Sequence, residues 1–223
     1  MAQKRILIVD DEVRMRRVIA DYLHIKGYET VEAADGVEAL GMFSLAPPDL
    51  VLLDVMMPRM DGWEVCRRLR AQSQVPIIML TARGQEEDEL QGFSLGADEY
   101  IAKPFSLKIR YARIEAVVRR GSEAPAAGVK ESGGLTVDLA GREVRVNGAP
   151  VELTYTEFEL LTYLMNNAGV ALSRDKILDS VWRYDYDGDA RTVDTHIKKL
   201  RSKLGEAGDC IKTIRGIGYK FEA

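Results

Sequence analysis

The apolar positions in the first half of the chain predict five strands that alternate with helices. The segment Ile-Leu-Ile-Val at 6–9 is continuously apolar, as in a strand that is buried on both faces. The strand candidates are residues 6–9, 30–33, 50–53, 77–80 and 100–102, and helical spacings follow at 13–23, 37–43, 63–69, 86–95 and 108–119. Alternation at this length predicts an α/β domain with a parallel sheet and helices on both of its faces.

The second half predicts short antiparallel strands, three helices and a terminal hairpin. Thr156, with Glu159 three residues later, is expected to cap the first of these helices. The predicted strands are 135–139, 143–146 and 151–153, separated by turns at Ala140-Gly141 and Asn147-Gly148; later helices occupy 174–182, after Ser173, and 191–204, and the hairpin joins 211–214 to 219–221. This order is that of a winged helix, a variant of the helix-turn-helix.

A linker is expected between the two halves. Residues 119–133 are mostly Gly, Pro, Ala, Ser and charged residues, without an apolar period. We therefore expect one domain at 1–120, a linker at 121–133 and a second domain at 134–223.

The composition is that of a globular protein, with 46% hydrophobic and 30% charged residues. No apolar run approaches the ~18 residues that cross a bilayer, and four apolar residues near the N-terminus are too few for a secretion signal. Cys66 and Cys210 are far apart and show no metal-ligand spacing. We expect a cytoplasmic protein, with no membrane segment and no disulfide framework.

The net charge of −4 does not by itself indicate a nucleic-acid partner, but the C-terminal segment is basic. Residues 191–220 contain eight basic and three acidic residues, a local charge of about +5. Such a patch on an acidic protein fits binding to a polyanion; on charge alone, a solvated helix face is an equal alternative.

The helix predicted at 191–204 is amphipathic, so one face should be buried and the basic side chains should lie on the others. Basic side chains on an exposed helix suit contacts with DNA phosphates and base edges, and a hairpin carrying an arginine can enter a minor groove. We expect His196 to be packed or capping, Asp194 to hydrogen-bond or form an ion pair, and the pair Trp182 and Tyr186 to pack a loop rather than stack on bases. The buried stripe should be Val193, Ile197, Leu200 and Leu204.

Polar residues with complementary chemistry stand at the ends of four predicted strands. Asp10 and Asp11 follow the first strand and Asp54 the third, whereas Thr81 ends the fourth and Lys103 the fifth. Because ligands bind at the carboxyl ends of parallel strands, near the point where strand order reverses, we expect these residues to meet. Each of them alone is more often a turn, capping or surface residue; their conjunction indicates a site.

Three carboxylates at short range repel one another and call for a cation. Oxygen ligands with room for water and a phosphate suit Mg²⁺, while Lys103 adds positive charge and Thr81 a hydroxyl donor. The set therefore fits phosphoryl transfer, which needs positioning and charge neutralisation. It would equally serve a Mg²⁺-dependent phosphatase or hydrolase with Asp54 as nucleophile, an alternative that leaves the second half unexplained.

Several segments of the first half carry a family resemblance. They are Ile-Leu-Ile-Val-Asp-Asp-Glu (6–12), Leu-Val-Leu-Leu-Asp-Val-Met-Met-Pro (50–58), Met-Asp-Gly (60–62), Met-Leu-Thr-Ala (79–82), Gly-Ala-Asp-Glu-Tyr (96–100) and Lys-Pro-Phe (103–105). With these segments, nearly all of residues 4–120 resemble the receiver domains of bacterial two-component response regulators. The resemblance implies a flavodoxin-like (βα)5 fold that accepts a phosphoryl group from a sensor histidine kinase and catalyses only its own Mg²⁺-dependent phosphorylation and dephosphorylation.

This resemblance implies a role for each matching residue. Asp54 is the phospho-acceptor and Lys103 contacts the phosphoryl group. The implied Mg²⁺ ligands are Asp11, Asp54, the backbone carbonyl of Met56 and, partly through water, Asp10. Thr81 also contacts the phosphoryl group and, with Tyr100, forms a switch pair in which the hydroxyl moves towards the phosphate and the ring turns inward.

The second half resembles the winged-helix effector domain of OmpR/PhoB-type transcription regulators, over residues 134–223. The match implies binding to double-stranded DNA, on tandem half-sites, while the loop at 183–190 corresponds to a segment that relatives offer to RNA polymerase. The matching segments are Thr-Tyr-Thr-Glu-Phe-Glu-Leu-Leu (154–161), Val-Trp (181–182) with Asp185, residues 191–201, and Thr-Ile-Arg-Gly-Ile-Gly-Tyr (213–219). The residues implied on DNA are Arg191, Lys198, Lys199, Arg201, Thr213 and Arg215.

One departure from the family pattern concerns the homodimer that forms on activation. Arg110, after Ile109, shares a helical stripe with Ile114 and Val117, where an apolar residue is expected. We hypothesise a weakened or rearranged dimer. Charged pairs for such a dimer would come from Asp98, Glu99, Arg113 and Arg119 or Arg120.

A third reading is a constitutive DNA-binding protein with a degenerate receiver. It predicts the loss of Asp54, Lys103 or the acidic pair, and all of these residues are present.

Overall fold

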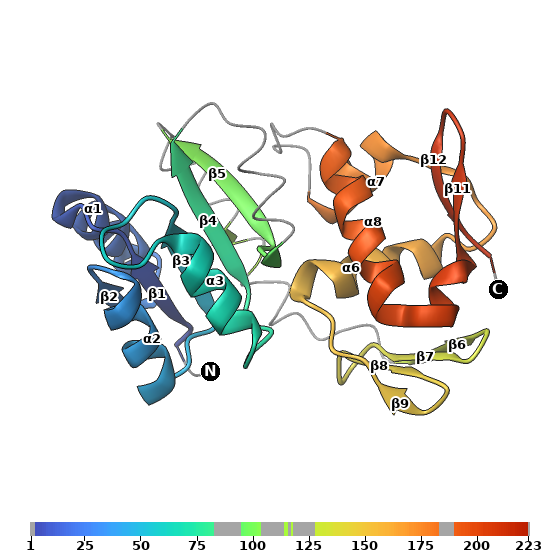
Figure 1. Cartoon of the computed structure of the whole chain (residues 1–223), viewed down its shortest axis with the longest axis horizontal. Coiled ribbons are helices and arrows are strands. Elements are labelled where there is room, and N and C mark those ends of the chain that lie inside the picture. Colours follow the sequence, from blue (N-terminus) through green and yellow to red (C-terminus); the bar gives the residue numbers. More distant parts are fainter. Residues whose placement is uncertain are drawn as a thin grey trace. The chain divides into compact units, whose positions relative to one another are not determined.

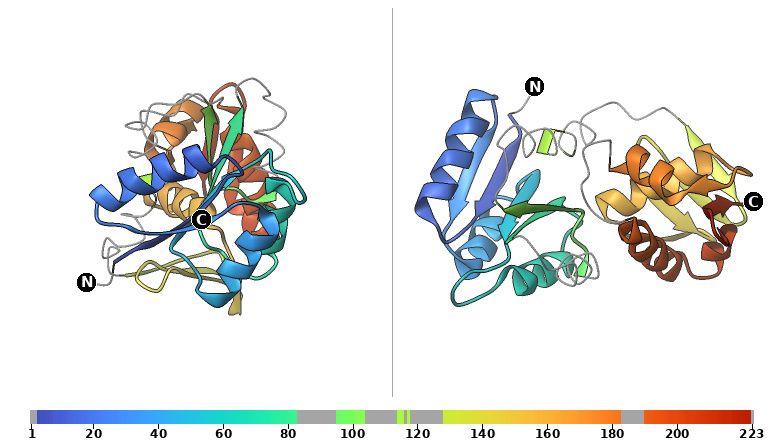
Figure 2. Two further views of the ribbon diagram at one scale, coloured as in Figure 1. Left: turned by 90° about the vertical axis from the view of Figure 1, so that its left-hand side faces the viewer. Right: turned by 90° about the horizontal axis from the view of Figure 1, so that it is seen from above.

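The computed structural model describes residues 3–82, 95–103, 114–115, 117, 128–182 and 190–222, with the backbone alone at 82, 102 and 103. The chain divides into two compact units, Met1–Glu123 and Ala124–Ala223 (Figure 1 and Figure 2). Each unit has a hydrophobic core of its own.

The first unit is built on a five-stranded, fully parallel sheet in the order β2-β1-β3-β4-β5. The order reverses between β1 and β3, and the carboxyl ends of these two strands therefore form the switch point of the sheet. This confirms the predicted flavodoxin-like arrangement. The strands are β1 (Arg5–Val9), β2 (Glu29–Ala33), β3 (Leu50–Asp54), β4 (Ile77–Ala82) and β5 (Glu99–Lys103).

Three helices of this unit lie in the described residues: α1 (Val13–Ile25), α2 (Gly36–Leu45) and α3 (Gly62–Arg70). Ile19 and Leu23 of α1 join one face of the sheet in a buried cluster, while α2 and α3 pack side by side (Figure 1). Only glycine permits that approach at Gly36, because a Cβ there would lie 2.5 Å from Cγ2 of Val65. The helices expected at 86–95 and 108–119 fall almost entirely outside the described residues.

Arg70, the last residue of α3, fixes the chain that enters β5. Its guanidinium donates to the carbonyl oxygens of Gly96 (2.8 Å) and Val75 (2.6 Å) and to the carboxylate of Asp98 (2.7 Å). The fully buried Asp98 also accepts from the N–H of Ile77 (3.0 Å). Asp98 was expected to contribute to contacts between two copies of the chain. That expectation is wrong, because its carboxylate is enclosed within the unit.

In its described residues the second unit has a four-stranded antiparallel sheet, three helices and a C-terminal hairpin, and this succession of strands, helices and hairpin is the one predicted for a winged helix (Figure 1). One apolar cluster joins all three helices to the sheet and the hairpin. The elements are β6 (Val129–Ser132), β7 (Leu135–Asp138), β8 (Glu143–Val146), β9 (Ala149–Pro150), α6 (Tyr155–Asn166), β10 (Leu172–Ser173), α7 (Arg174–Val181), α8 (Arg191–Leu204), the 3₁₀ helix η1 (Gly205–Cys210), β11 (Ile211–Ile214) and β12 (Gly218–Phe221).

Two strand expectations in this unit need correction. Residues 129–132, predicted to belong to the linker, form β6 and pair with β7, with Lys130 opposite Val137. The third strand of the meander is β9, rather than residues 151–153. β6 lies at the edge of the sheet with none of its residues buried, so burial leaves no apolar pattern that a sequence could show.

The N-cap of the first helix in this unit lies two residues before the predicted cap. The segment Thr-Tyr-Thr-Glu-Phe-Glu contains two overlapping capping boxes, and the structure uses Thr154 with Glu157 instead of Thr156 with Glu159. The N–H of Thr154 donates to the Glu157 carboxylate (2.8 Å), which also accepts from Lys203 of α8 (2.6 Å). Glu159 of the other box pairs with Arg142 (2.8 Å) instead, so distant cations hold both glutamates and only Glu157 also caps the helix.

We expect Thr154→Ala to destabilise the second unit by about 1 kcal/mol, because an N-cap oxygen is lost. Thr154→Ser keeps that oxygen and should restore most of the stability. Urea unfolding monitored through Trp182, in a Trp63→Phe background, measures the effect. Equal stability of the alanine and serine variants would contradict the assignment of the cap.

Candidate functional site

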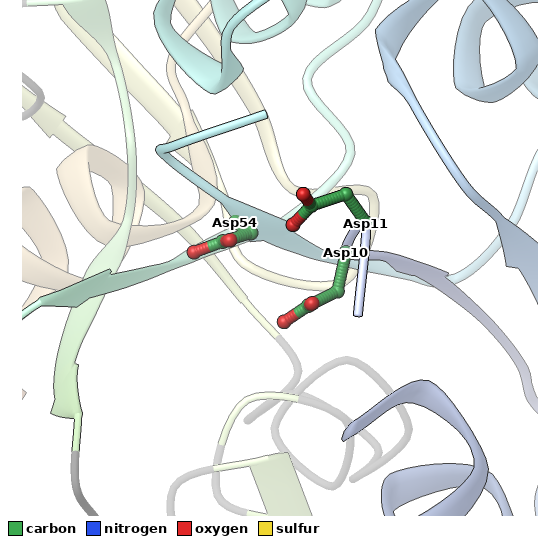
Figure 3. Close-up of side chains that lie close together, drawn as sticks. All are labelled: Asp10, Asp11 and Asp54. Atoms are coloured by element: carbon green, nitrogen blue, oxygen red, sulfur yellow. The ribbon is translucent and has the colours of Figure 1, made fainter. Parts of the chain in front are cut away.

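Three carboxylates converge at the switch point of the parallel sheet. Asp10 and Asp11 follow β1 and Asp54 is the last residue of β3, and one carboxylate oxygen from each lies within 4.8 Å of the others (Figure 3). Asp10 and Asp54 are buried, whereas Asp11 is exposed. The acidic triad is thus open to solvent on one side, as a site that takes up an ion and a phosphoryl donor must be.

Backbone contacts hold the triad in place. The Asp10 carboxylate accepts the N–H of Glu12 (2.9 Å), and the Asp10 carbonyl accepts from Nη1 of Arg16 (2.6 Å). On the other strand, the N–H of Gly62 donates to the carbonyl of Val55 (2.9 Å). A Cβ at residue 62 would lie 2.2 Å from the carbonyl oxygen of Asp54, so only glycine allows the chain to return this close to the acidic residue.

The donor set fits Mg²⁺. Carboxylate oxygens are the hard ligands that this ion prefers, and gathering three of them without a cation is electrostatically unfavourable. Thr81 is buried near the end of β4, adjacent to β3, and Lys103 ends β5. The side chain of Lys103, like Pro104, lies outside the described residues.

Tyr100 lies inside the unit. It is on β5, opposite Met79 of β4, with only 2% of its surface exposed. Its ring centroid lies 6.1 Å from that of Trp63 near the start of α3. No sequence pattern places Trp63 beside Tyr100, because the two residues are far apart in the chain and meet only through the fold.

In the second unit, α8 buries the predicted apolar stripe. Val193, Ile197, Leu200 and Leu204 are each at most 1% exposed. Arg191 and Lys198 are exposed and Lys199 is half-buried, so α8 presents a basic surface away from the core. The hairpin β11–β12 adds exposed side chains, Thr213 and Arg215, to the basic surface of the unit.

Arg201 has a structural role that the sequence did not reveal. Its guanidinium donates to the carbonyl of Ile211 (3.0 Å from Nε) and to the hydroxyl of Thr213 (3.0 Å). It also lies 5.5 Å from the ring centroid of Tyr219. Arg201 therefore ties α8 to the hairpin.

Asp194 makes a second connection between α8 and its neighbours. Its carboxylate accepts from Nε of Arg174 on α7 (2.7 Å) and from the hydroxyl of Tyr219 on β12 (2.6 Å). Burial, followed by the bond to Asp194, raises the pKa of Tyr219 to about 12. The predicted hydrogen-bonding and ion-pairing role of Asp194 is confirmed. Its partners Arg174 and Tyr219 carry no local sequence signal for that role.

His196 is part of the core, as expected. It is 1% exposed, and its ring centroid lies 5.0 Å from that of the buried Trp182. Burial, with smaller effects from Lys199 and Lys203, lowers its pKa from 6.5 to about 3. It therefore stays neutral at physiological pH and does not face DNA. Tyr186, expected beside Trp182, lies outside the described residues.

Comparison with known proteins defines the class of each unit. Residues 6–115 match the response regulator receiver domain, and residues 148–221 match the C-terminal domain of transcriptional regulatory proteins. The fold and both matches define a DNA-binding response regulator of a two-component system.

Full-length relatives narrow this class. The chain is 46% identical to the sensory transduction protein RegX3 of Mycolicibacterium smegmatis, covering 97% of this chain and 98% of that protein. It is 44% identical to the transcriptional regulatory protein ResD of Bacillus subtilis, over 99% and 96%. The crystal structure of DrrB, a Thermotoga maritima OmpR/PhoB homologue, is similar with a TM-score of 0.54 and 31% identity over 100% of both chains. The chain belongs to the OmpR/PhoB family of response regulators.

Among the helices in the described part of the chain, none combines the length and the apolar character needed to cross a bilayer.

Acid should destabilise the second unit through His196. Between pH 6.5 and about 3 the unfolded state binds a proton that the buried ring excludes, so stability present above pH 6.5 is lost as the pH falls. We expect a loss of about 2 kcal/mol from this residue between pH 7 and pH 5.

Urea unfolding at both pH values, followed through Trp182 in a Trp63→Phe background, measures this loss. His196→Leu should remove that part of the pH dependence, whereas His24→Leu, on α1 of the first unit, should leave it in place. A wild-type unit that is equally stable at both pH values would contradict the assignment.

Proposed function

We propose that Asp54 is the residue that a sensor histidine kinase phosphorylates, and that this modification controls DNA binding by the second unit in the cytoplasm. The observation that carries the proposal is the acidic triad, with carboxylate oxygens from β1 and β3 within 4.8 Å at the switch point. A phosphatase acting on small substrates would share this triad, but it would not account for the winged helix.

In the transfer step, a carboxylate oxygen of Asp54 forms a bond to phosphorus while the bond from phosphorus to the imidazole nitrogen of the kinase breaks. The electron pair of that bond stays on the imidazole, and Asp54 becomes an acyl phosphate. The hydroxyl of Thr81 then donates a hydrogen bond to a phosphoryl oxygen, and Lys103 offsets the added negative charge.

Mg²⁺ would be held by Asp11, Asp54, the carbonyl of Met56 and, partly through water, Asp10. When bound, it neutralises the carboxylates and the phosphoryl oxygens. The residues of the chain orient the attacking oxygen: Gly62 allows the close return of the chain behind Asp54, and Arg16 fixes the carbonyl of Asp10.

Phosphorylation is coupled to DNA binding through Thr81 and Tyr100. The Thr81 hydroxyl moves towards the phosphate, and the Tyr100 ring moves with it. These movements change how the first unit self-associates. Arg110 weakens or rearranges the resulting homodimer. Two effector units held together bind tandem half-sites of DNA through a raised effective concentration. RNA polymerase is a further partner, through the loop at 183–190.

The DNA surface consists of α8 and the hairpin. Arg191, Lys198 and Lys199 face the phosphates and base edges of the major groove, while Thr213 and Arg215 contact the flanking backbone or minor groove. Arg201 contributes as well, with its guanidinium also fixed to the hairpin.

Asp54→Asn should abolish modification by a small phosphodonor such as acetyl phosphate in the presence of Mg²⁺, because the nucleophilic oxygen is lost. Intact-protein mass spectrometry should show one added phosphoryl group on the wild type and none on the variant. The matched control is Asp61→Asn, since Asp61 caps α3 outside the triad and asparagine preserves a cap.

Phosphorylation of the Asp54→Asn protein would contradict the assignment of Asp54 as the phosphorylated residue. Beryllofluoride with Mg²⁺ should also shift the wild-type protein towards a dimer in sedimentation velocity, and should leave Asp54→Asn unchanged.

Lys198→Ala should weaken DNA binding about equally across sequences and reduce the slope of log K against log salt concentration by about 1, as for one lost phosphate contact. Fluorescence anisotropy on a duplex selected from a random pool measures both quantities. Lys130→Ala provides the control, because Lys130 lies on β6 and pairs with Asn166. An unchanged slope for Lys198→Ala would remove Lys198 from the DNA surface.

A further inference from the structure

The corner between β2 and α2 carries no ligand of the acidic triad, but two of its carboxylates contact arginines that come from the ligand-bearing segments. Glu32, on β2, faces Arg16 of α1, and Asp35, the N-cap of α2, pairs with Arg59 of the β3–α3 loop. Neither contact is needed to explain the core, since both arginines lie outside the apolar clusters.

Arg16 links the corner to the first two acidic residues. Its Nη1 donates to the Asp10 carbonyl at 2.6 Å, while its Nε lies 3.4 Å from a carboxylate oxygen of Glu32. Its side chain is 11% exposed, so the guanidinium is held largely out of water. The N–H of Asp10 also donates to the Ala33 carbonyl (3.3 Å). The turn that presents Asp10 and Asp11 is therefore anchored to β2 through both backbone groups of Asp10, its N–H directly and its carbonyl by way of Arg16.

Arg59 links the same corner to the loop that follows Asp54. It has a φ of 68°, the left-handed region that residues with a Cβ seldom adopt. A glycine at this position would relieve the backbone but could not pair with Asp35, whose side chain is only 3% exposed. The strained conformation is thus associated with an ion pair that reaches across to α2.

Hydrogen bonds and close packing hold the corner at the start of α2. The Asp35 carboxylate accepts the N–H groups of Val37 (2.7 Å) and Glu38 (3.0 Å) at the start of α2. Next to it, a Cβ at Gly36 would come within 2.9 Å of Met60, so the helix start presses directly on the β3–α3 loop.

We propose that Arg16 and Arg59 are positioning residues, which transmit the geometry of the β2–α2 corner to the two segments that supply the cation ligands. The inference rests on the proposed Mg²⁺ site and names residues that control its affinity. Charge and positioning predict opposite effects here. Removing a positive charge near three carboxylates should strengthen Mg²⁺ binding, whereas releasing the ligand segments should weaken it.

The test is isothermal titration calorimetry of Mg²⁺ into the full-length protein and its variants. We expect Arg16→Ala and Arg59→Ala to weaken Mg²⁺ affinity about tenfold, the lower end of the effect of residues that orient metal ligands. Arg59→Lys, which can still pair with Asp35, should recover most of the affinity. Arg59→Gly should not recover it, although it relieves the backbone.

Arg5→Ala is the matched control. Arg5 pairs with Glu29 (2.9 Å) between the same two strands, β1 and β2, but at their opposite ends. Its removal eliminates an arginine–carboxylate pair of the same kind without touching a ligand segment, and should leave Mg²⁺ affinity unchanged.

Asp35→Asn keeps the helix cap and removes the charge, so it should weaken Mg²⁺ binding as Arg59→Ala does. The double variant Asp35→Asn/Arg59→Ala should bind Mg²⁺ no more weakly than either single variant, since both substitutions remove the same contact. Additive losses would overturn the role of this pair.

Unchanged or tighter Mg²⁺ binding in Arg16→Ala and Arg59→Ala would overturn the inference while leaving the proposed function intact. A wild-type protein that binds no Mg²⁺, or an Asp11→Asn/Asp54→Asn protein that binds it as well as the wild type, would overturn the cation site itself and the inference with it.

Discussion

The first unit depends on a concentration of negative charge that the fold assembles at one point. Asp10, Asp11 and Asp54 meet because β1 and β3 are neighbours in the sheet, and the strand order reverses between them. Repulsion between like charges at this range opposes folding, so contacts from the surrounding chain have to hold the three carboxylates together. The backbone contacts of Asp10 and the close return at Gly62 do this. The same repulsion makes the site responsive, because a cation or a transferred group changes the balance of charge locally.

The arginine–carboxylate pairs near the triad have two different structural roles. Arg70 and Asp98 are enclosed and hold the entry to β5, where Tyr100 lies one residue into the strand. Arg16 and Arg59 instead connect a ligand-free corner to the segments around the triad. The enclosed pair holds the entry to β5, whereas we infer that the two more peripheral arginines position the segments that carry the acidic triad.

In the second unit, α8 has one face buried in the core and another exposed to solvent. The apolar stripe of α8 anchors it, and Asp194 and Arg201 connect it to α7 and the hairpin. Because these contacts are polar and directional, they fix the rotation of the helix as well as its depth. The basic side chains therefore leave the surface at defined angles, which recognition of a groove requires.

By itself, the sequence determined the alternation of strands and helices in the described part of the first unit, the buried stripe of α8 and the acidic residues at strand ends. These are local patterns: periodicity reports which positions are buried, and residues at successive parallel strand ends must share an edge. The tertiary structure alone decided which of two overlapping capping boxes begins α6, since their glutamates pair with cations elsewhere in the chain, Glu157 with Lys203 and Glu159 with Arg142. It also decided that β6 is a strand, that Asp98 is enclosed by Arg70, and that Arg16 and Arg59 meet the β2–α2 corner. Each of these depends on a partner brought close by folding, and no local pattern of polar and apolar residues encodes that proximity.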